Sequence, residues 1–362
     1  MKVVWVVQKG NTGAREQSFE LANHVDDVTP VYGEPLGIDH ADPFVRDEQG
    51  VLHATGGLDE AVRALSPDVV VFHNINAHVI QEATKIQQHT PTVLRAGLNF
   101  LESVMSGQGH AGGIPQLMQF IQARDHVVAP SEPTERDIRS IGIDEQRVSV
   151  IPTALSMADD LCREPDLNAP ATVGHLSARV SPLKNQHTTI KAIGLIRDID
   201  PVHRVNALVT GETNPYRQAF EQQVVRMGLA DRIEFVGYID DPDEGFWPEV
   251  GVHVCPSFSE RHPQVVLEAA RAGVTTFIAD GGWADTFPDC FPRFPPDDPS
   301  QWAVAIDEYL QNDALRARTA AEQQEFVRDN YAVGAVVPQY VDVLERVVDR
   351  VGPFKTDGSV IA

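Results

Sequence analysis

The sequence predicts an α/β protein made of two doubly wound domains in tandem. Short, almost continuously apolar runs recur along the 362 residues and alternate with stretches of helical periodicity, which is typical of parallel strands covered on both faces. The alternation is interrupted once, at residues 156–170, and then restarts. A chain of this length is too long for one ordinary core and long enough for two.

The first half of the chain carries five apolar runs that we expect to be strands. Most are rich in valine and isoleucine, which favours buried strands of a parallel sheet. A turn with two glycines, at residues 10–13, follows the first run and leads into a helical stretch. The runs are residues 3–7, 68–73, 92–94, 126–129 and 147–152.

The second half repeats this alternation after a polar, acidic segment that contains two prolines. The new runs are residues 172–176, 206–209, 233–235, 252–254 and 275–278. Doubly wound folds bind ligands outside the carboxyl ends of their strands, so we expect the active site in the cleft between the domains. We predict an N-terminal Rossmann-like domain over residues 1–155, a linker over 156–170, a C-terminal Rossmann-like domain over 171–335, and a helix with a loose tail over 336–362.

The composition argues against several classes of protein. A net charge of −23 argues against nucleic-acid binding and against electrostatic docking on anionic lipid. No run approaches the roughly 20 apolar residues that a membrane-spanning helix needs. The three cysteines are an odd number at unrelated spacings, so they indicate reduced thiols rather than a disulfide framework or a zinc site.

Lysine is scarce in this chain, which has 6 lysines and 23 arginines against 52 acidic residues. An acidic excess with little lysine is expected of a halophilic protein, because molar salt screens charge repulsion within a few ångströms. An acidic protein of ordinary salt is the alternative. Full folding and activity without added KCl would exclude the halophilic interpretation.

The first seven residues are apolar but too few for a signal peptide, and no small-residue cleavage site follows them. We interpret them as a first strand. This predicts a cytoplasmic protein that makes at most a peripheral contact with the inner face of the membrane.

A helix that follows the run at residues 252–254 offers a binding site for an anion. Pro263 suits its first turn, and Gly273 suits the position after its last residue. The N–H groups of Gln264, Val265 and Val266 would then point into the cleft. A helix N-terminus attracts anions, and a diphosphate is the obvious one.

Four charged residues accompany this helix. Glu260 lies on the loop before it and Glu268 interrupts its apolar stretch, although a solvated carboxylate is the alternative for the latter. Arg179 and Lys184 follow another predicted strand and lie five positions apart. They suit a diphosphate as a planar fork and a point charge, with a surface ion pair as the alternative.

At these segments the sequence resembles the retaining glycosyltransferase family 4, the "group 1" family whose GT-B fold has two facing Rossmann-like domains. Residues 179–184 read Arg-Val-Ser-Pro-Leu-Lys, close to the family's Arg-Leu-Ser-Pro-x-Lys. Glu260 and Glu268 are separated by seven residues, as are the two glutamates of the family. The resemblance covers residues 125–285 well and residues 1–124 weakly.

The resemblance implies a catalytic set of Glu260, Arg179 and Lys184. Arg179 and Lys184 would bind the donor's diphosphate, Glu260 would lie beside the transferred sugar, and Glu268 would accept hydrogen bonds from the ribose. The other donor-binding residues would be Gly13 over the phosphates, Gly237 and Tyr238 near the base, and His262, Pro263, Gln264, Val265 and Val266 along the sugar and phosphate. For Gly13 a plain turn, and for Tyr238 an ordinary half-buried aromatic, are the alternatives.

The resemblance also implies a reaction in which the sugar leaves and is captured on the same face. Cations can stabilise the leaving diphosphate, so neither a metal nor a cofactor is needed, and the acidic loop at residues 240–244 reads as a solvated turn. We predict a metal-independent, hexosyltransferase-type glycosyltransferase of glycan biosynthesis. It would move a sugar from a nucleotide-sugar donor to a glycan, lipid-linked or small-molecule acceptor. The alternatives are a nucleotide-sugar epimerase and a non-catalytic nucleotide-sugar or glycan-binding relative.

The chain departs from the family at three places. The turn at residues 210–213 has one glycine where two are common. Arg261 and His262 replace the usual Gly-Phe after the first glutamate. The histidine that many members carry after the strand at residues 92–94 is missing. His73 or His110 would have to replace it, although a lone histidine is more often structural.

Overall fold

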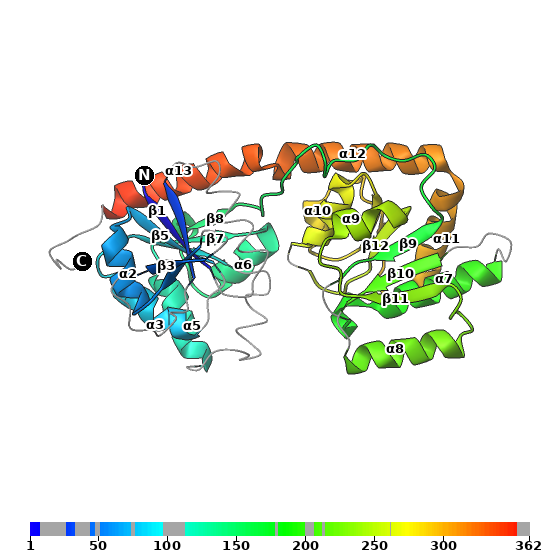
Figure 1. The fold of residues 1–362 in the computed structure, drawn as a ribbon, viewed down its shortest axis with the longest axis horizontal. Helices are drawn as coiled ribbons and strands as arrows, with labels where there is room; N and C mark the ends of the chain where they lie inside the picture. The colour runs from blue at the N-terminus through cyan, green and yellow to red at the C-terminus, as the bar shows by residue number, and fades with distance from the viewer. Residues whose placement is uncertain are drawn as a thin grey trace. The chain divides into compact units, whose positions relative to one another are not determined.

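The computed structural model describes residues 1–7, 27–32, 44–47, 51–73, 77–96, 113–177, 180–199, 206–211, 214–260 and 262–352. These residues form two compact units (Figure 1). The first unit combines Met1–Ala154 with Val333–Ala362, and the second is Leu155–Ala332. The prediction of two parallel-sheet α/β domains is confirmed.

The first unit is built on an eight-stranded sheet of order β3-β4-β2-β1-β5-β6-β7-β8. Its strands pair in parallel, apart from the antiparallel pair β3 and β4 at one edge. The strands are β1 (Val3–Val7), β2 (Val28–Tyr32), β3 (Phe44–Arg46), β4 (Leu52–Ala54), β5 (Val69–His73), β6 (Thr92–Arg95), β7 (His126–Ala129) and β8 (Val148–Val150). The helices are α2 (Leu58–Leu65), α3 (Ala77–Ile86), α5 (Gly113–Ala123), α6 (Glu132–Ser140), the 3₁₀ turn η1 (Glu145–Arg147) and α13 (Val333–Val351).

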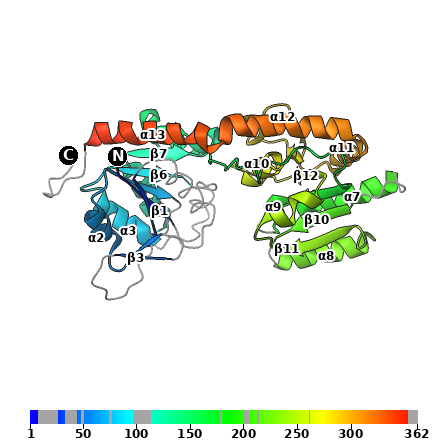
Figure 2. The same cartoon turned by 45° about the horizontal axis from the view of Figure 1, so that its top comes forward.

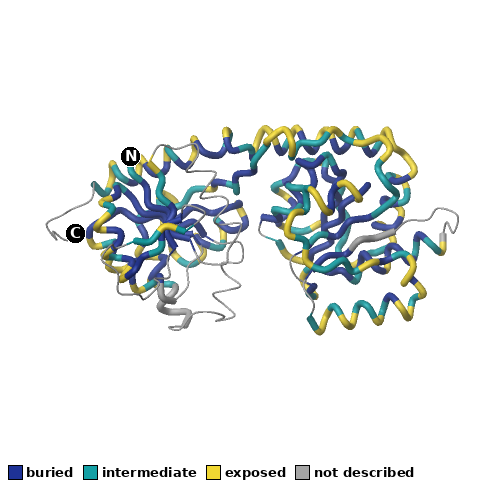
Figure 3. Tube along the Cα trace, in the orientation of Figure 1, coloured by how far each residue is buried: buried dark blue, intermediate teal, exposed yellow. Residues whose placement is uncertain are grey.

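The side chains of β1 alternate between two cores, as the period of a strand requires. Val4 and Val6 pack among α2, α3, α5 and α6. Trp5 faces the other side, where its ring meets that of Tyr340 on α13 at 5.5 Å. Figure 2 shows α13 along this side of the sheet, and Figure 3 shows the strands buried between the two helical layers.

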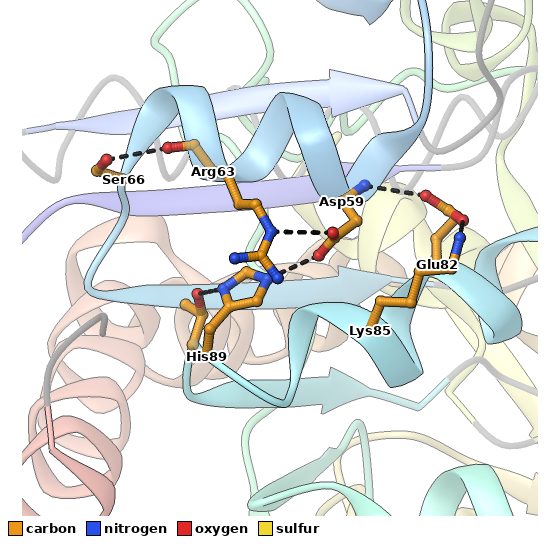
Figure 4. A network of polar contacts seen from close by, with 7 residues as sticks. Asp59, Arg63, Ser66, Glu82, Lys85 and His89 are labelled. Atoms are coloured by element: carbon orange, nitrogen blue, oxygen red, sulfur yellow. Dashed lines mark hydrogen bonds and ion pairs between the residues drawn. The ribbon is translucent and has the colours of Figure 1, made fainter. Parts of the chain in front are cut away.

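A polar network ties α2 to α3 (Figure 4). Asp59 accepts hydrogen bonds from Arg63 at 3.0 Å and lies 2.6 Å from His89 Nε2, while its backbone N–H donates to Glu82 at 3.0 Å. Burial alone would raise the pKa of Asp59, but the hydrogen bonds from His89 and Arg63 hold that pKa below its usual value. The network fixes the orientation of the two helices outside the core.

The second unit is built on a six-stranded parallel sheet of order β11-β10-β9-β12-β13-β14. The strands are β9 (Thr172–His175), β10 (Asn206–Thr210), β11 (Ile233–Gly237), β12 (Val252–Cys255), β13 (Thr275–Ala279) and β14 (Arg293–Phe294). The helices are η2 (Pro182–Lys184), α7 (Gln186–Ile199), α8 (Pro215–Arg226), α9 (Pro242–Gly245), η3 (Trp247–Glu249), α10 (Gln264–Arg271), η4 (Ala284–Thr286), α11 (Pro299–Gln311) and α12 (Asp313–Tyr331).

The chain passes between the units twice, and the two passages begin side by side. Leu155 donates its N–H to the carbonyl of Tyr331 at 2.8 Å and forms a parallel bridge with Ala332. Contacts group residues 156–170 with the second unit and α13 with the first. Within the described ranges, no helix is long and apolar enough to cross a bilayer.

Candidate functional site

The first loop of the candidate site follows β9 and carries Lys184 in a single 3₁₀ turn. Ser181 caps this turn by accepting the N–H of Lys184 at 3.4 Å, and Pro182 occupies its first position. Asn185 ends the turn with a left-handed backbone (φ 54°), a conformation that asparagine tolerates better than most residues. The next residue, Gln186, begins α7, so Lys184 lies two residues before a helix N-terminus.

The second loop joins β12 to α10 and carries Glu260. The structure corrects one detail of the predicted anion site. Pro263 precedes α10 instead of lying in its first turn, and its carbonyl accepts the N–H of Val266 at 3.0 Å. The N–H of Val266 is therefore occupied within the turn, which leaves those of Gln264 and Val265 for a ligand. Gly273 follows the helix with φ +72°, as predicted.

Contacts between described residues join these two loops, which lie far apart in sequence. Lys184 Nζ lies 2.5 Å from Glu260 Oε1. Phe258 donates its N–H to the carbonyl of Leu183 at 2.9 Å, and the Asn185 side-chain amide donates to the carbonyl of Pro256 at 3.0 Å. Both charged side chains keep access to solvent, with 32% of Lys184 and 12% of Glu260 exposed. The structure thus brings together the cation and the carboxylate that the sequence singled out.

The groups beneath the Lys184–Glu260 pair are held neutral. Burial, followed by the nearby Lys184 charge, lowers the pKa of His175 to about 3. Burial, followed by the Glu260 charge, raises the pKa of the Cys255 thiol to about 12. At neutral pH these two buried neighbours therefore add no charge of their own to the Lys184–Glu260 pair.

His262 does not offer its side chain to a ligand. Only 3% of the residue is exposed, and its ring stacks on that of Tyr331, the last residue of α12, at 5.4 Å and 30°. Burial raises the pKa of Tyr331 to about 12, so its ring is neutral. His262 can therefore present only its backbone to a ligand, because its ring packs against the Tyr331 ring.

The remaining predicted residues of the second unit lie on β11 and α10. Gly237 ends β11 with φ +86°, and its carbonyl accepts the N–H of Gly211 at 2.9 Å. Tyr238 follows it with 56% of its surface exposed. Glu268 lies in α10, partly exposed between two buried neighbours. Arg179, Gly13, Arg261 and His110 lie outside the described residues.

Sequence reasoning missed two residues that shape this site. The Asn185 amide bridges the carbonyls of Pro256 and Pro296, and so fixes one side of the Glu260 loop. An asparagine between a predicted turn and a predicted helix is a detectable signal for such a position. Tyr331 gave no signal, because it is 69 positions from the histidine that it contacts.

Comparisons with known proteins match both units. The model of the glycosyl transferases group 1 matches residues 170–312, and that of glycosyltransferase family 4 matches residues 14–158. The lipopolysaccharide core biosynthesis glycosyltransferase LpsD of Rhizobium meliloti is 29% identical over 160 residues. That alignment spans 43% of this chain and 46% of LpsD, less than half of either protein.

Solved structures share the fold at low sequence identity. HepE of Anabaena, in complex with UDP and glucose, has a TM-score of 0.71 at 18% identity and covers 96% of this chain and 100% of its own. Sucrose-phosphate synthase of Thermosynechococcus elongatus has a TM-score of 0.73 at 16% identity, covering 97% and 100%. A glycosyltransferase of Rickettsia africae has a TM-score of 0.74 at 13% identity, covering 96% and 98%. With the two family matches and the GT-B fold, the chain belongs to the group 1 glycosyltransferases of family 4.

Proposed function

We propose that the protein transfers a hexose from a nucleotide-sugar donor to an acceptor with retention of the anomeric configuration. The observation that carries this proposal is the meeting of Lys184 and Glu260 in front of α7, at the carboxyl ends of β9 and β12. A cation and a carboxylate in contact suit a donor whose diphosphate and sugar are bound side by side.

The order of the strands suits the length of such a donor. Tyr238 follows β11 and Glu260 follows β12, which are three positions apart in the sheet. At about 4.8 Å between neighbouring strands, this separation is about 14 Å, enough for a nucleotide sugar in an extended conformation. The base would lie by Tyr238 and the sugar by Glu260. HepE binds UDP and UDP-glucose, which supports a uridine nucleotide as the first donor to try.

The chemistry would need no nucleophile from the protein. Lys184, with Arg179, would offset the charge that develops on the leaving diphosphate. The backbone N–H groups of Gln264 and Val265 would add fixed dipoles at the N-terminus of α10. Glu260 would contact the transferred sugar and orient the ammonium group of Lys184. We propose that neither a metal nor a cofactor takes part.

The composition of the chain bears on the conditions and the compartment in which it works. A chain with so many carboxylates and so few lysines is suited to molar salt, where we expect it to work in the cytoplasm on glycan or lipid-linked acceptors. Its contact with the membrane would be at most peripheral.

Acceptor-dependent turnover tests the proposed reaction. UDP-glucose and other nucleotide sugars are incubated in molar KCl with an extract of glycans and lipid-linked sugars, and the anomeric configuration of the product is read by proton NMR. We expect consumption of the donor only with acceptor, and a product with the donor's configuration. An inverted product would contradict retention, and consumption without acceptor would favour an epimerase or a hydrolase.

A further inference from the structure

Two buried basic side chains end neighbouring strands of the first unit. His73 is the last residue of β5 and Arg95 the last residue of β6, and the two are paired in the register of the sheet. Only 7% of His73 and 1% of Arg95 is exposed. Residues paired across parallel strands point to the same face, so both side chains share one environment.

The Arg95 guanidinium has no buried counter-charge among the described residues. Its Nη1 donates to the carbonyl of Ala96 at 3.0 Å and its Nη2 to the hydroxyl of Thr153 at 3.1 Å, both neutral acceptors. Its Nε is buried and has no hydrogen-bond partner. A buried cation is costly unless a negative charge compensates it, so this environment is incomplete.

Arg124, in the same unit, shows what a purely structural buried arginine looks like. It is as buried as Arg95, but each of its three nitrogens has a partner: the carbonyls of Phe120 and Ala83, and the side chain of Gln87. Two of these bonds go to carbonyls in the last turns of α5 and α3. Arg95 differs from Arg124 by its left-over Nε and by its place at a strand end. Arg316 also leaves its Nε unpaired, but it forms an ion pair with Asp313 at 2.8 Å, whereas Arg95 forms no ion pair with a described carboxylate.

Two further buried polar atoms on this face of the sheet lack a hydrogen-bond partner. The Nδ1 of His73 and the Nε1 of Trp5 are also buried without a partner, and the Trp5 and His73 rings are 6.1 Å apart. Burial and the Arg95 charge hold the pKa of His73 well below its usual value, so its ring is neutral. Buried polar atoms are almost always paired, and three unpaired ones on one face indicate a missing partner.

The position of these groups indicates what the partner is. Parallel α/β sheets bind ligands outside the carboxyl ends of their strands, and both residues lie at that edge. We propose that Arg95 and His73 form a subsite for an oxyanion, a phosphate or a carboxylate, carried by the acceptor. The guanidinium supplies the charge, and the neutral imidazole supplies one hydrogen bond. This inference rests on the proposed glycosyl transfer, because it names the chemical class of the acceptor.

Inorganic phosphate is the simplest probe of this subsite. Its dissociation constant is measured by calorimetry in KCl on the full chain and on Arg95→Met, with Lys184→Ala to remove phosphate bound at the donor loops. We expect Lys184→Ala to retain a phosphate site that Arg95→Met weakens about ten-fold or more, the loss expected for a charge-assisted hydrogen bond. The matched control is Arg124→Met, which should lower the melting temperature without removing that site.

Arg95→Lys and His73→Phe keep the test decisive if Arg95→Met does not fold. Both should weaken phosphate binding, since neither retains the full donor set. Wild-type phosphate affinity in all folded variants, or no saturable phosphate site in the wild type, would overturn the subsite. Failure of the proposed function would instead appear as a wild type that binds no nucleoside diphosphate.

Treatment of the acceptor extract separates the two sources of the oxyanion. Loss of acceptor activity after phosphatase would assign a phosphate, and loss after amidation of carboxyl groups would assign a carboxylate. Retention of activity after both treatments would contradict an anionic acceptor.

Discussion

Two single substitutions in the Lys184–Glu260 pair are expected to change donor affinity in opposite directions. The ammonium group lies 2.5 Å from the carboxylate, so a diphosphate that binds Lys184 must share it with Glu260. Lys184→Ala removes a charge-assisted contact, worth about 1.5–3 kcal/mol in a buried site. Because a third of the lysine is exposed, we expect the lower end, roughly a ten-fold weaker affinity for UDP.

Glu260→Gln keeps the shape of the side chain and removes its charge. This frees the ammonium group for the diphosphate and removes a repulsion between two anions. We expect UDP to bind more tightly by about 1 kcal/mol, roughly five-fold, while turnover falls.

Isothermal titration of UDP into the wild type, each single variant and the double variant measures both effects. The tightening by Glu260→Gln should be smaller in the Lys184→Ala background, since only the removed repulsion between Glu260 and the diphosphate is left to act there. If Glu260→Gln instead weakens UDP as much as Lys184→Ala does, the two side chains do not compete, and the assigned arrangement is wrong.

Three further predictions concern stability and the donor loop. Lowering the pH from 7 to 5 should reduce the free energy of unfolding by about 2 kcal/mol for each of His175 and His253. Burial lowers the pKa of both folded histidines to about 3, so they stay neutral over this range. In the unfolded chain the same histidines take up protons below about pH 6.5, which stabilises the unfolded state. Urea titrations at both pH values measure this loss. The free energy of unfolding of His253→Phe should depend less on pH than that of the wild type, and an equal dependence would contradict the prediction. Tyr331→Ala should weaken UDP binding, because it removes the ring behind His262. A double-mutant cycle with His262→Ala should show a coupling of about 0.5–1.5 kcal/mol in UDP binding, and additivity would refute the positioning role. Gly251→Ala should destabilise by about 1–3 kcal/mol, since its Cβ would overlap a backbone carbonyl oxygen, and an unchanged melting temperature would contradict the packing.

Most of the strands that the sequence predicted are buried on both faces, whereas the edge strands β8 and β11 are partly exposed. β1 and β5 are continuous valine-rich runs, and their pattern identified them without further information. β2 was missed because Pro30 stands in its middle, where a ladder hydrogen bond is lost. β4 and β14 are too short, at three and two residues, for any periodicity to emerge.

Long-range packing explains what the sequence could not show. The apolar stripe of α13 predicts a helix that packs on a core, but not which core, and the helix returns to the first unit. Lys184 and Glu260 were both predicted as donor residues from local motifs. Their direct contact depends on the Asn185 and Phe258 hydrogen bonds that join the loops, which no local pattern encodes.

A thermal-shift panel in molar KCl tests the central claim, a metal-independent nucleotide-sugar site at Lys184, most directly. UDP, GDP, ADP, TDP and CMP are compared on the wild type and Lys184→Ala, first without metal and then with magnesium. We predict that one nucleoside diphosphate stabilises the wild type without metal and that Lys184→Ala loses the shift. If no nucleotide stabilises the wild type under either condition, the donor site assigned to these loops is wrong.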